Sequence, residues 1–237
     1  MESLMNQSRW RSLTAGVLLA GCVAGCGSDD APAPPAGGSQ PAASAQPAAS
    51  TRPRVVFLGD SLTAGLGLSQ AQAFPSLIAE RLQREGIDAD VVNAGISGDT
   101  AAGGRRRLNW ALEGNVKVLV LGLGANDGLR GTSVAGMKEN LEAIIRDAKG
   151  RGITVLLLGM EAPPNFGPEY TAEFRQAFRD LADDEDVAFI PFFLAGVAGV
   201  PALNQPDGLH PNADGASRVA DNVWKALEPI VEQAAAR

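Results

Sequence analysis

The chain has 237 residues, of which 45% are hydrophobic and 20% charged, a composition typical of globular proteins. Its formal net charge of −7 at pH 7 supplies no broad basic surface, which excludes nucleic acid as an expected partner. There is 1 histidine, and the 2 cysteines both lie near the N-terminus, so we expect no metal site and no disulfide in the rest of the chain.

Residues 1–26 have the features of an export signal. Arg9 and Arg11 precede an uncharged, mostly apolar stretch that is too short for a comfortable membrane span. The sequences Leu-Ala-Gly-Cys and Val-Ala-Gly-Cys, ending at Cys22 and Cys26, both resemble the lipobox of bacterial lipoproteins, in which the cysteine is acylated. Small, polar residues follow Cys26, so we favour it over Cys22. The alternative is an ordinary cleaved signal peptide. In both cases we expect export, and with acylation a lipid anchor in the bacterial cell envelope, facing the periplasm or the outer surface.

Residues 27–53 are dense in Pro, Ala, Ser, Gly and Gln. Such a segment has too little apolar surface to offset the entropy of ordering, so we expect a disordered linker. The remaining residues, 54–237, are enough for one compact domain that buries roughly 70% of its unfolded surface.

Within this domain, short apolar runs alternate with stretches of helical period. The runs are rich in Val, Ile and Leu and fit strands buried on both faces of a parallel sheet; they are residues 54–58, 89–92, 116–121, 153–158 and 187–190. Helical spacing of apolar residues lies between them, over 74–82, 134–145, 170–181 and from about Ala213 to Val231, where Pro229 is expected to kink the end. The pattern predicts the α/β class: a single three-layer, doubly wound domain with a five-stranded parallel sheet.

Polar, Gly-rich turns follow four of the predicted strands. Ligands of open α/β sheets bind outside the carboxyl ends of the strands. Ser61 follows the first strand, Gly98 the second, Asn126 the third, and Asp207 and His210 the fifth. We therefore expect these turns to meet at the edge of the sheet formed by the carboxyl ends of the strands, the carboxyl edge.

The residues at this edge can perform acyl transfer. Ser61 alone could equally cap a helix or close a turn, but His210, the only histidine, is the one candidate for a base that activates it. Asp207, three residues earlier, can reach the other imidazole nitrogen. The backbone N–H groups of Ser61 and Gly98 and the side-chain amide of Asn126 are the candidate oxyanion donors.

These turns resemble the four signature blocks of the GDSL, or SGNH, hydrolases, over nearly all of residues 54–232. The matching blocks are Gly59-Asp60-Ser61-Leu62, Gly98, Gly124-Ala125-Asn126-Asp127 and Asp207-Gly208-Leu209-His210. Within that family the chain looks most like the bacterial acyl-CoA thioesterase I, lysophospholipase and arylesterase subgroup. The resemblance implies a flavodoxin-like sheet, the same roles for the residues named above, and no metal or organic cofactor.

In the resembling subgroup, the loop after the fourth strand lines the acyl groove. Pro163, Asn165 and Phe166 are therefore candidate substrate-binding residues. An Arg often stands where this chain has Glu161, which leaves acyl-chain length and tolerance of anionic substrates open. The alternative is a rigid, Pro-rich connector.

We expect an exported, monomeric serine esterase or thioesterase that hydrolyses acyl esters through an acyl-Ser61 intermediate. The alternatives are a carbohydrate acetylesterase with a shallower groove and a non-catalytic binding lipoprotein of the cell envelope. Arg105–Arg107 is expected to be a solvated helix face, with attraction of an anionic head group or lipid surface as the alternative. Asp183–Asp186 is expected to be a solvated helix end, and Asp60 and Asp127 to hold turns rather than act as bases.

Overall fold

Five parallel strands form the centre of the described chain. In space their order is β2-β1-β3-β4-β5, the order of flavodoxin-like sheets, and every neighbouring pair is parallel. The predicted α/β class and five-stranded parallel sheet are therefore confirmed. The strands are β1 (Arg54–Gly59), β2 (Asp90–Gly95), β3 (Val116–Gly122), β4 (Thr154–Leu158) and β5 (Ala188–Ile190).

The structure, a computed structural model, describes residues 52–235. The predicted signal peptide with Cys22 and Cys26, and the predicted linker up to Thr51, lie outside these residues. Arg52 and Pro53, which we had assigned to the linker, contact the domain. Arg52 forms an ion pair with Asp90 at 2.8 Å, and the Pro53 carbonyl accepts the Asp90 N–H at 2.8 Å.

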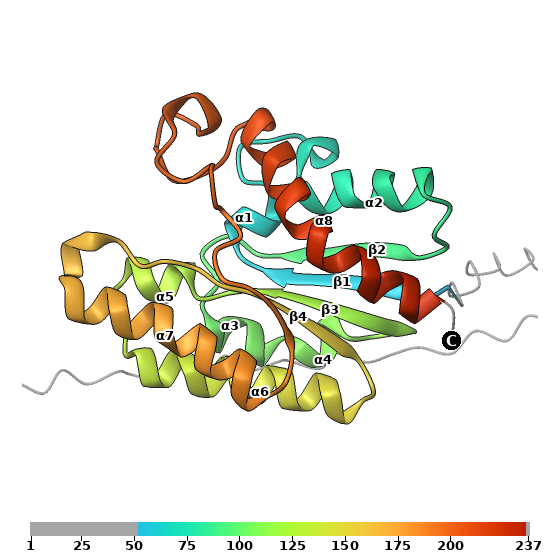
Figure 1. Cartoon of the computed structure of the whole chain (residues 1–237), viewed down its shortest axis with the longest axis horizontal. Helices are drawn as coiled ribbons and strands as arrows, with labels where there is room; N and C mark the ends of the chain where they lie inside the picture. Colours follow the sequence, from blue (N-terminus) through green and yellow to red (C-terminus); the bar gives the residue numbers. More distant parts are fainter. Residues whose placement is uncertain (1–51, 236–237) are drawn as a thin grey trace, which may run out of the picture. The chain divides into compact units, whose positions relative to one another are not determined.

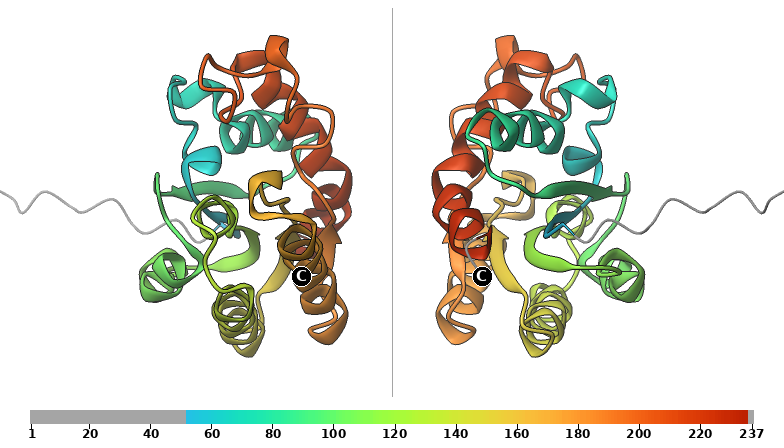
Figure 2. Two further views of the ribbon diagram at one scale, coloured as in Figure 1. Left: turned by 90° about the vertical axis from the view of Figure 1, so that its left-hand side faces the viewer. Right: turned by 90° about the vertical axis from the view of Figure 1, so that its right-hand side faces the viewer.

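Helices cover both faces of the sheet and make the predicted three layers. The helices α2 (Phe74–Arg84) and α8 (Ala213–Ala235) lie above it in Figure 1, and α3 (Ala101–Arg106), α6 (Val134–Gly150) and α7 (Pro168–Asp184) lie below. The side views of Figure 2 show the same two helical layers. Helix α8 continues past Pro229, so the proline does not end it.

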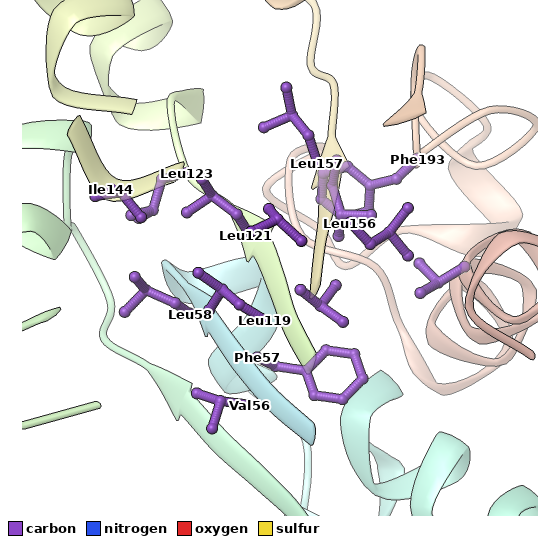
Figure 3. Close-up of a cluster of buried hydrophobic side chains, with 14 of the residues drawn as sticks. Val56, Phe57, Leu58, Leu119, Leu121, Leu123, Ile144, Leu156, Leu157 and Phe193 are labelled. Carbon is purple, nitrogen blue, oxygen red and sulfur yellow. The ribbon is translucent and has the colours of Figure 1, made fainter. Parts of the chain in front are cut away.

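The central strands carry the core. The side chains of Val56, Phe57 and Leu58 on β1 are fully buried, together with Leu119 and Leu121 on β3 (Figure 3). The edge strands β2 and β5 are mostly only half-buried, which differs from the burial on both faces that we predicted for all the strands. An edge strand lacks a neighbour on one side, so less of its surface is covered.

Several short helices were not predicted, because one turn of helix gives too little periodicity to detect. They are α1 (Ser61–Ala64), α4 (Leu108–Ala111) and α5 (Ala125–Leu129), with the 3₁₀ turns η1 (Gln70–Gln72), η2 (Pro164–Phe166) and η3 (Pro201–Leu203). Figure 1 places α1, α5 and the loop between β5 and α8 at the same side of the sheet. That side is the edge at which the candidate residues were expected to meet.

Candidate active site

Ser61 lies at the point where β1 turns into α1. Asp60 caps this helix, because its carboxylate accepts the Leu62 N–H at 3.0 Å. Gly59 lets the helix pack closely on the strand end: a Cβ there would lie 1.9 Å from the Thr63 hydroxyl oxygen and 2.9 Å from the Gly122 carbonyl oxygen. The turn therefore fixes the Ser61 hydroxyl outside the carboxyl end of the central strand.

A chain of hydrogen bonds joins Ser61, His210 and Asp207. The Ser61 Oγ lies 2.9 Å from His210 Nε2, and Nδ1 of the same ring lies 2.7 Å from Asp207 Oδ2. The other Asp207 oxygen accepts the backbone N–H groups of Leu209 at 2.9 Å and His210 at 3.0 Å. These bonds, first the backbone and then the side chain of His210, lower the pKa of Asp207 from 3.8 to about 2. A carboxylate that is ionised at neutral pH orients the ring and stabilises imidazolium.

The turn that carries His210 is tied to the segment after α1. The side-chain amide of Gln205 donates to the carbonyls of Leu66 at 2.7 Å and Pro211 at 2.9 Å, and its backbone N–H donates to the His210 carbonyl at 2.8 Å. Buried Asn204 holds the preceding loop through the carbonyls of Val197 and Val200. The Ser61–His210 distance is thus fixed by contacts between loops far apart in the sequence.

Two backbone N–H groups at the site are free to bind an oxyanion. Among residues 52–235, neither the Ser61 nor the Gly98 N–H donates a hydrogen bond. Gly98 has φ +82°, a conformation that side chains rarely adopt, although a Cβ would have space, since Arg130 Nη2 at 3.9 Å would be the nearest atom. The Arg130 guanidinium donates to the Gly98 carbonyl at 3.0 Å and so fixes this loop.

The third candidate donor, the Asn126 amide, already has two acceptors. Its nitrogen lies 3.0 Å from the Asp99 carbonyl oxygen and 3.3 Å from Asp60 Oδ2. Both contacts orient the amide, and an oxyanion has to share one of its hydrogens. Burial raises the pKa of Asp60 from 3.8 to about 6, although the hydrogen bonds from Leu62 and Asn126 favour its charged form.

A groove of about 410 Å³ opens beside these residues, within the usual size range of ligand sites. Pro163 lines it as expected. Asn165 and Phe166 do not line it, and the Phe166 ring instead packs at 5.4 Å from that of Tyr170. The other lining residues come from the four segments that follow β1, β3, β4 and β5, and they are mostly apolar: Ser61, Leu62, Ala125, Asn126, Leu129, Met160, Glu161, Ala162, Pro164, Phe192, Leu194, Ala198, Gly199, Gly208, Leu209 and His210.

The family model described as "GDSL-like Lipase/Acylhydrolase family" matches residues 57–218. The chain belongs to this family. Esterase TesA of Pseudomonas aeruginosa is 44% identical over 178 residues, covering 75% of this chain and 89% of the relative. Thioesterase 1/protease 1/lysophospholipase L1 of Escherichia coli is 38% identical, covering 75% of this chain and 84% of the relative. The predicted resemblance to the thioesterase, lysophospholipase and arylesterase subgroup is therefore confirmed.

Solved structures agree with the family. The crystal structure of TesA superposes with a TM-score of 0.72 at 44% identity and covers 75% of this chain and 99% of that one. AlinE4, described as an SGNH-hydrolase family esterase, gives a TM-score of 0.63 at 38% identity, covering 76% and 95%. This member of the GDSL-like family is a serine hydrolase that acts on ester bonds.

Arg107 is a positioning residue that the sequence did not reveal. Its guanidinium pairs with Asp99 at 2.6 Å and donates to the carbonyls of Ala94 at 2.7 Å and Gly59 at 2.9 Å. It thereby joins the carboxyl ends of β1 and β2, directly before the turns of Ser61 and Gly98. The prediction of a solvated helix face was wrong for Arg107, whose side chain is 13% exposed, and right for Arg105 and Arg106.

Three other acidic groups have structural partners. Asp127 is buried and accepts the Ala101 N–H at 2.9 Å, which begins α3, and burial raises its pKa. Glu185 is also buried and pairs with Arg146 at 2.7 Å, so the predicted solvated helix end is wrong at this residue. Glu161, at the groove, pairs with Arg175 at 3.2 Å. The described residues hold no group of three or more His, Cys, Asp or Glu placed to bind a metal ion.

Proposed function

We propose that this chain is an exported, lipid-anchored esterase that cleaves single acyl chains from esters through an acyl-Ser61 intermediate. The observation that carries the proposal is the hydrogen-bonded row Ser61–His210–Asp207 beside an apolar groove. The groove volume of about 410 Å³ equals roughly a dozen groups of the size of water or a methylene. This space suits an acyl chain better than an acetyl group.

The reaction follows from the geometry. His210 Nε2 accepts the Ser61 hydroxyl proton as Oγ attacks the ester carbonyl, and Asp207 stabilises the imidazolium. The N–H groups of Ser61 and Gly98, with the Asn126 amide, donate to the oxyanion. Each such donor contributes about 3 kcal/mol to transition-state stabilisation. The leaving alcohol takes the proton from His210, and water then cleaves the acyl-Ser61 ester by the same steps.

The test is hydrolysis of p-nitrophenyl esters from acetate to palmitate by the purified full chain and by Ser61→Ala, with labelling by a fluorophosphonate probe. We expect labelling at Ser61 and a maximum above acetate. Activity confined to acetate would favour the carbohydrate acetylesterase. Absence of both activity and labelling would favour the binding lipoprotein.

Glu161 bears on the charge of the substrate. Its carboxylate lies at the groove, where it pairs with Arg175 at 3.2 Å, and its negative charge disfavours anionic esters such as acyl-CoA. Glu161→Gln should raise kcat/KM for acyl-CoA about fivefold relative to a neutral ester of the same acyl chain, because one nearby charge contributes about 1 kcal/mol in water. An unchanged ratio would mean that the acyl-CoA charge never approaches Glu161.

The anchor and the location rest on the sequence of residues 1–26. The lipobox-like segments support acylation at Cys26, or at Cys22, and a place in the bacterial cell envelope. No helix within residues 52–235 is long and apolar enough to cross a bilayer. Labelled fatty acid should be incorporated by growing cells into the protein and not into the Cys22→Ala/Cys26→Ala variant. Labelling that persists in that variant would contradict the anchor.

A further inference from the structure

The exposed hydrophobic side chains of this domain are concentrated at one edge. All the large ones among residues 52–235, except Trp110, lie on loops or short helices that follow the carboxyl end of a strand. We call these residues the apolar rim: Leu66 after β1, Ile96 after β2, Leu129 after β3, Phe166 after β4, and Val200 and Leu209 after β5. Scattered apolar residues on a surface need no explanation, but a set gathered at one site does.

Contacts between the loops hold parts of this rim together around the groove. Gln205 bonds to the Leu66 carbonyl and joins the loop of Leu66 to that of Val200 and Leu209. Arg130 bonds to the Gly98 carbonyl and joins the loop of Ile96 to the helix of Leu129. Leu129 and Leu209 also line the groove beside Ser61. The rim is therefore continuous with the space proposed to hold an acyl chain.

Two long stretches of the chain, which include loops after β1 and β5, carry no charge. No Asp, Glu, Lys or Arg occurs from Ser61 to Ala79 or from Val187 to Pro206, although charged residues make up 20% of the chain. A second hollow of about 400 Å³, lined by Val200 and uncharged neighbours, shares Gly199 and Gly208 with the groove. Along these two stretches a protein partner of ordinary surface would meet no ionic complement, whereas hydrocarbon and the uncharged boundary of a lipid layer require none.

We propose that the apolar rim docks onto the surface of a lipid aggregate, so that an acyl chain passes from it directly into the groove. This inference rests on the proposed function, because it assigns the same lipid chemistry to the groove and to its surroundings. The rim side chains enter the boundary between head groups and acyl chains, and the groove mouth is closed to bulk water while the protein is docked.

The chain allows a site-resolved test, because its 2 cysteines, Cys22 and Cys26, lie outside the domain. In the full chain with Cys22→Ser and Cys26→Ser, a polarity-sensitive dye is attached to Leu66→Cys, to Val200→Cys or to the control Trp110→Cys. Trp110 is 60% exposed and lies on α4, which precedes β3 at the opposite edge of the sheet. Comparison within one background removes any contribution of residues 1–26 to vesicle binding.

On mixing with phosphatidylcholine vesicles, the dye at positions 66 and 200 should increase in emission severalfold and the dye at 110 should not. Equal responses at all three positions, or none at 66 and 200, would overturn the proposal. A response at 66 that grows with protein concentration without vesicles would overturn it as well, since the rim would then bind a second copy of the chain.

Activity gives a second readout. Phe166→Ser changes a rim residue that does not line the groove and whose ring packs against Tyr170, and Trp110→Ser is its control. The rim variant should hydrolyse a vesicle-borne lysophospholipid about tenfold more slowly, as expected for lost burial of apolar side chains, with p-nitrophenyl acetate hydrolysis unchanged. Equal activity of both variants on vesicles would contradict docking. If no ester is hydrolysed at all, the proposed function fails, and the dye measurement still decides on docking.

Discussion

At the carboxyl edge of the sheet the ion pair of Arg107 and Asp99 is held inside, whereas at the amino edge that of Arg151 and Asp147 lies on the surface. Arg107 and Asp99 are 13% and 16% exposed, and they tie strand ends together. Arg151 and Asp147, at the end of α6 that leads into β4, are 37% and 42% exposed. The two edges are the carboxyl and the amino ends of the same parallel strands. The difference indicates that the inner pair at the carboxyl edge positions the reacting groups, whereas the outer pair at the amino edge is part of a hydrated surface.

The largest effect that separates the two edges should be on catalysis. Ser61→Ala and His210→Ala should each lower kcat by a factor on the order of 10⁴ to 10⁶, and the double variant should lose little more, because the two groups act in one step. Hydrolysis of p-nitrophenyl esters measures this, with Trp110→Ser as an amino-edge control that keeps full activity. Losses that add up in the double variant would contradict a shared step.

A smaller effect should distinguish the two ion pairs. Arg107→Met removes the cation that pairs with Asp99 and the side-chain donor to the Ala94 and Gly59 carbonyls, of which Gly59 keeps the Ile96 N–H. We expect a loss of about 3 kcal/mol in the free energy of unfolding. Arg151→Met should cost less than about 0.5 kcal/mol, because an exposed pair is screened by water. Urea unfolding measures both. Similar losses in the two variants would remove the distinction between the edges.

Two glycines offer a matched pair in backbone strain. Gly98 at the carboxyl edge and Gly152 before β4 have φ of +82° and +74°, and neither has an atom close enough to clash with a Cβ. Gly98→Ala and Gly152→Ala should each cost about 1 kcal/mol of stability. Only Gly98→Ala should also lower kcat, about tenfold, by turning its N–H away from the oxyanion. An unchanged kcat would mean that the Gly98 N–H is not an oxyanion donor.

An effect of similar size to that of the glycines concerns the pH dependence of stability. The pKa of Asp60 is about 6 in the folded chain, against an ordinary value of 3.8, so the folded state binds this proton more tightly. The contribution of Asp60 to the free energy of unfolding should thus rise by about 1 kcal/mol from pH 7 to pH 5 and reach its full value below pH 3.8. Urea unfolding of wild type and Asp60→Asn at both pH values isolates the group. Parallel pH profiles would contradict a raised pKa.

Much of the fold could be predicted because its signals are local. Runs of Val, Ile and Leu gave the five strands within a few residues, and the helical spacing from Val134 to Ile145 gave α6. The apolar wall of the groove could not be predicted. Met160, Phe192 and Leu194 follow strands as ordinary apolar residues, and only the meeting of loops places them beside Ser61. Phe166 and Asn165, expected at the groove, do not line it.

The sequence by itself determined which groups could react. A single histidine, a serine after a buried strand and an aspartate three residues before the histidine left one arrangement, because acyl transfer needs a base and only one exists. The tertiary structure decided how these groups are held. Arg107 reaches the Gly59 carbonyl from 48 residues away and Asn126 reaches Asp60 from 66. Such contacts depend on which strands lie side by side in the sheet, and the periodicity of apolar residues along the chain does not predict that order.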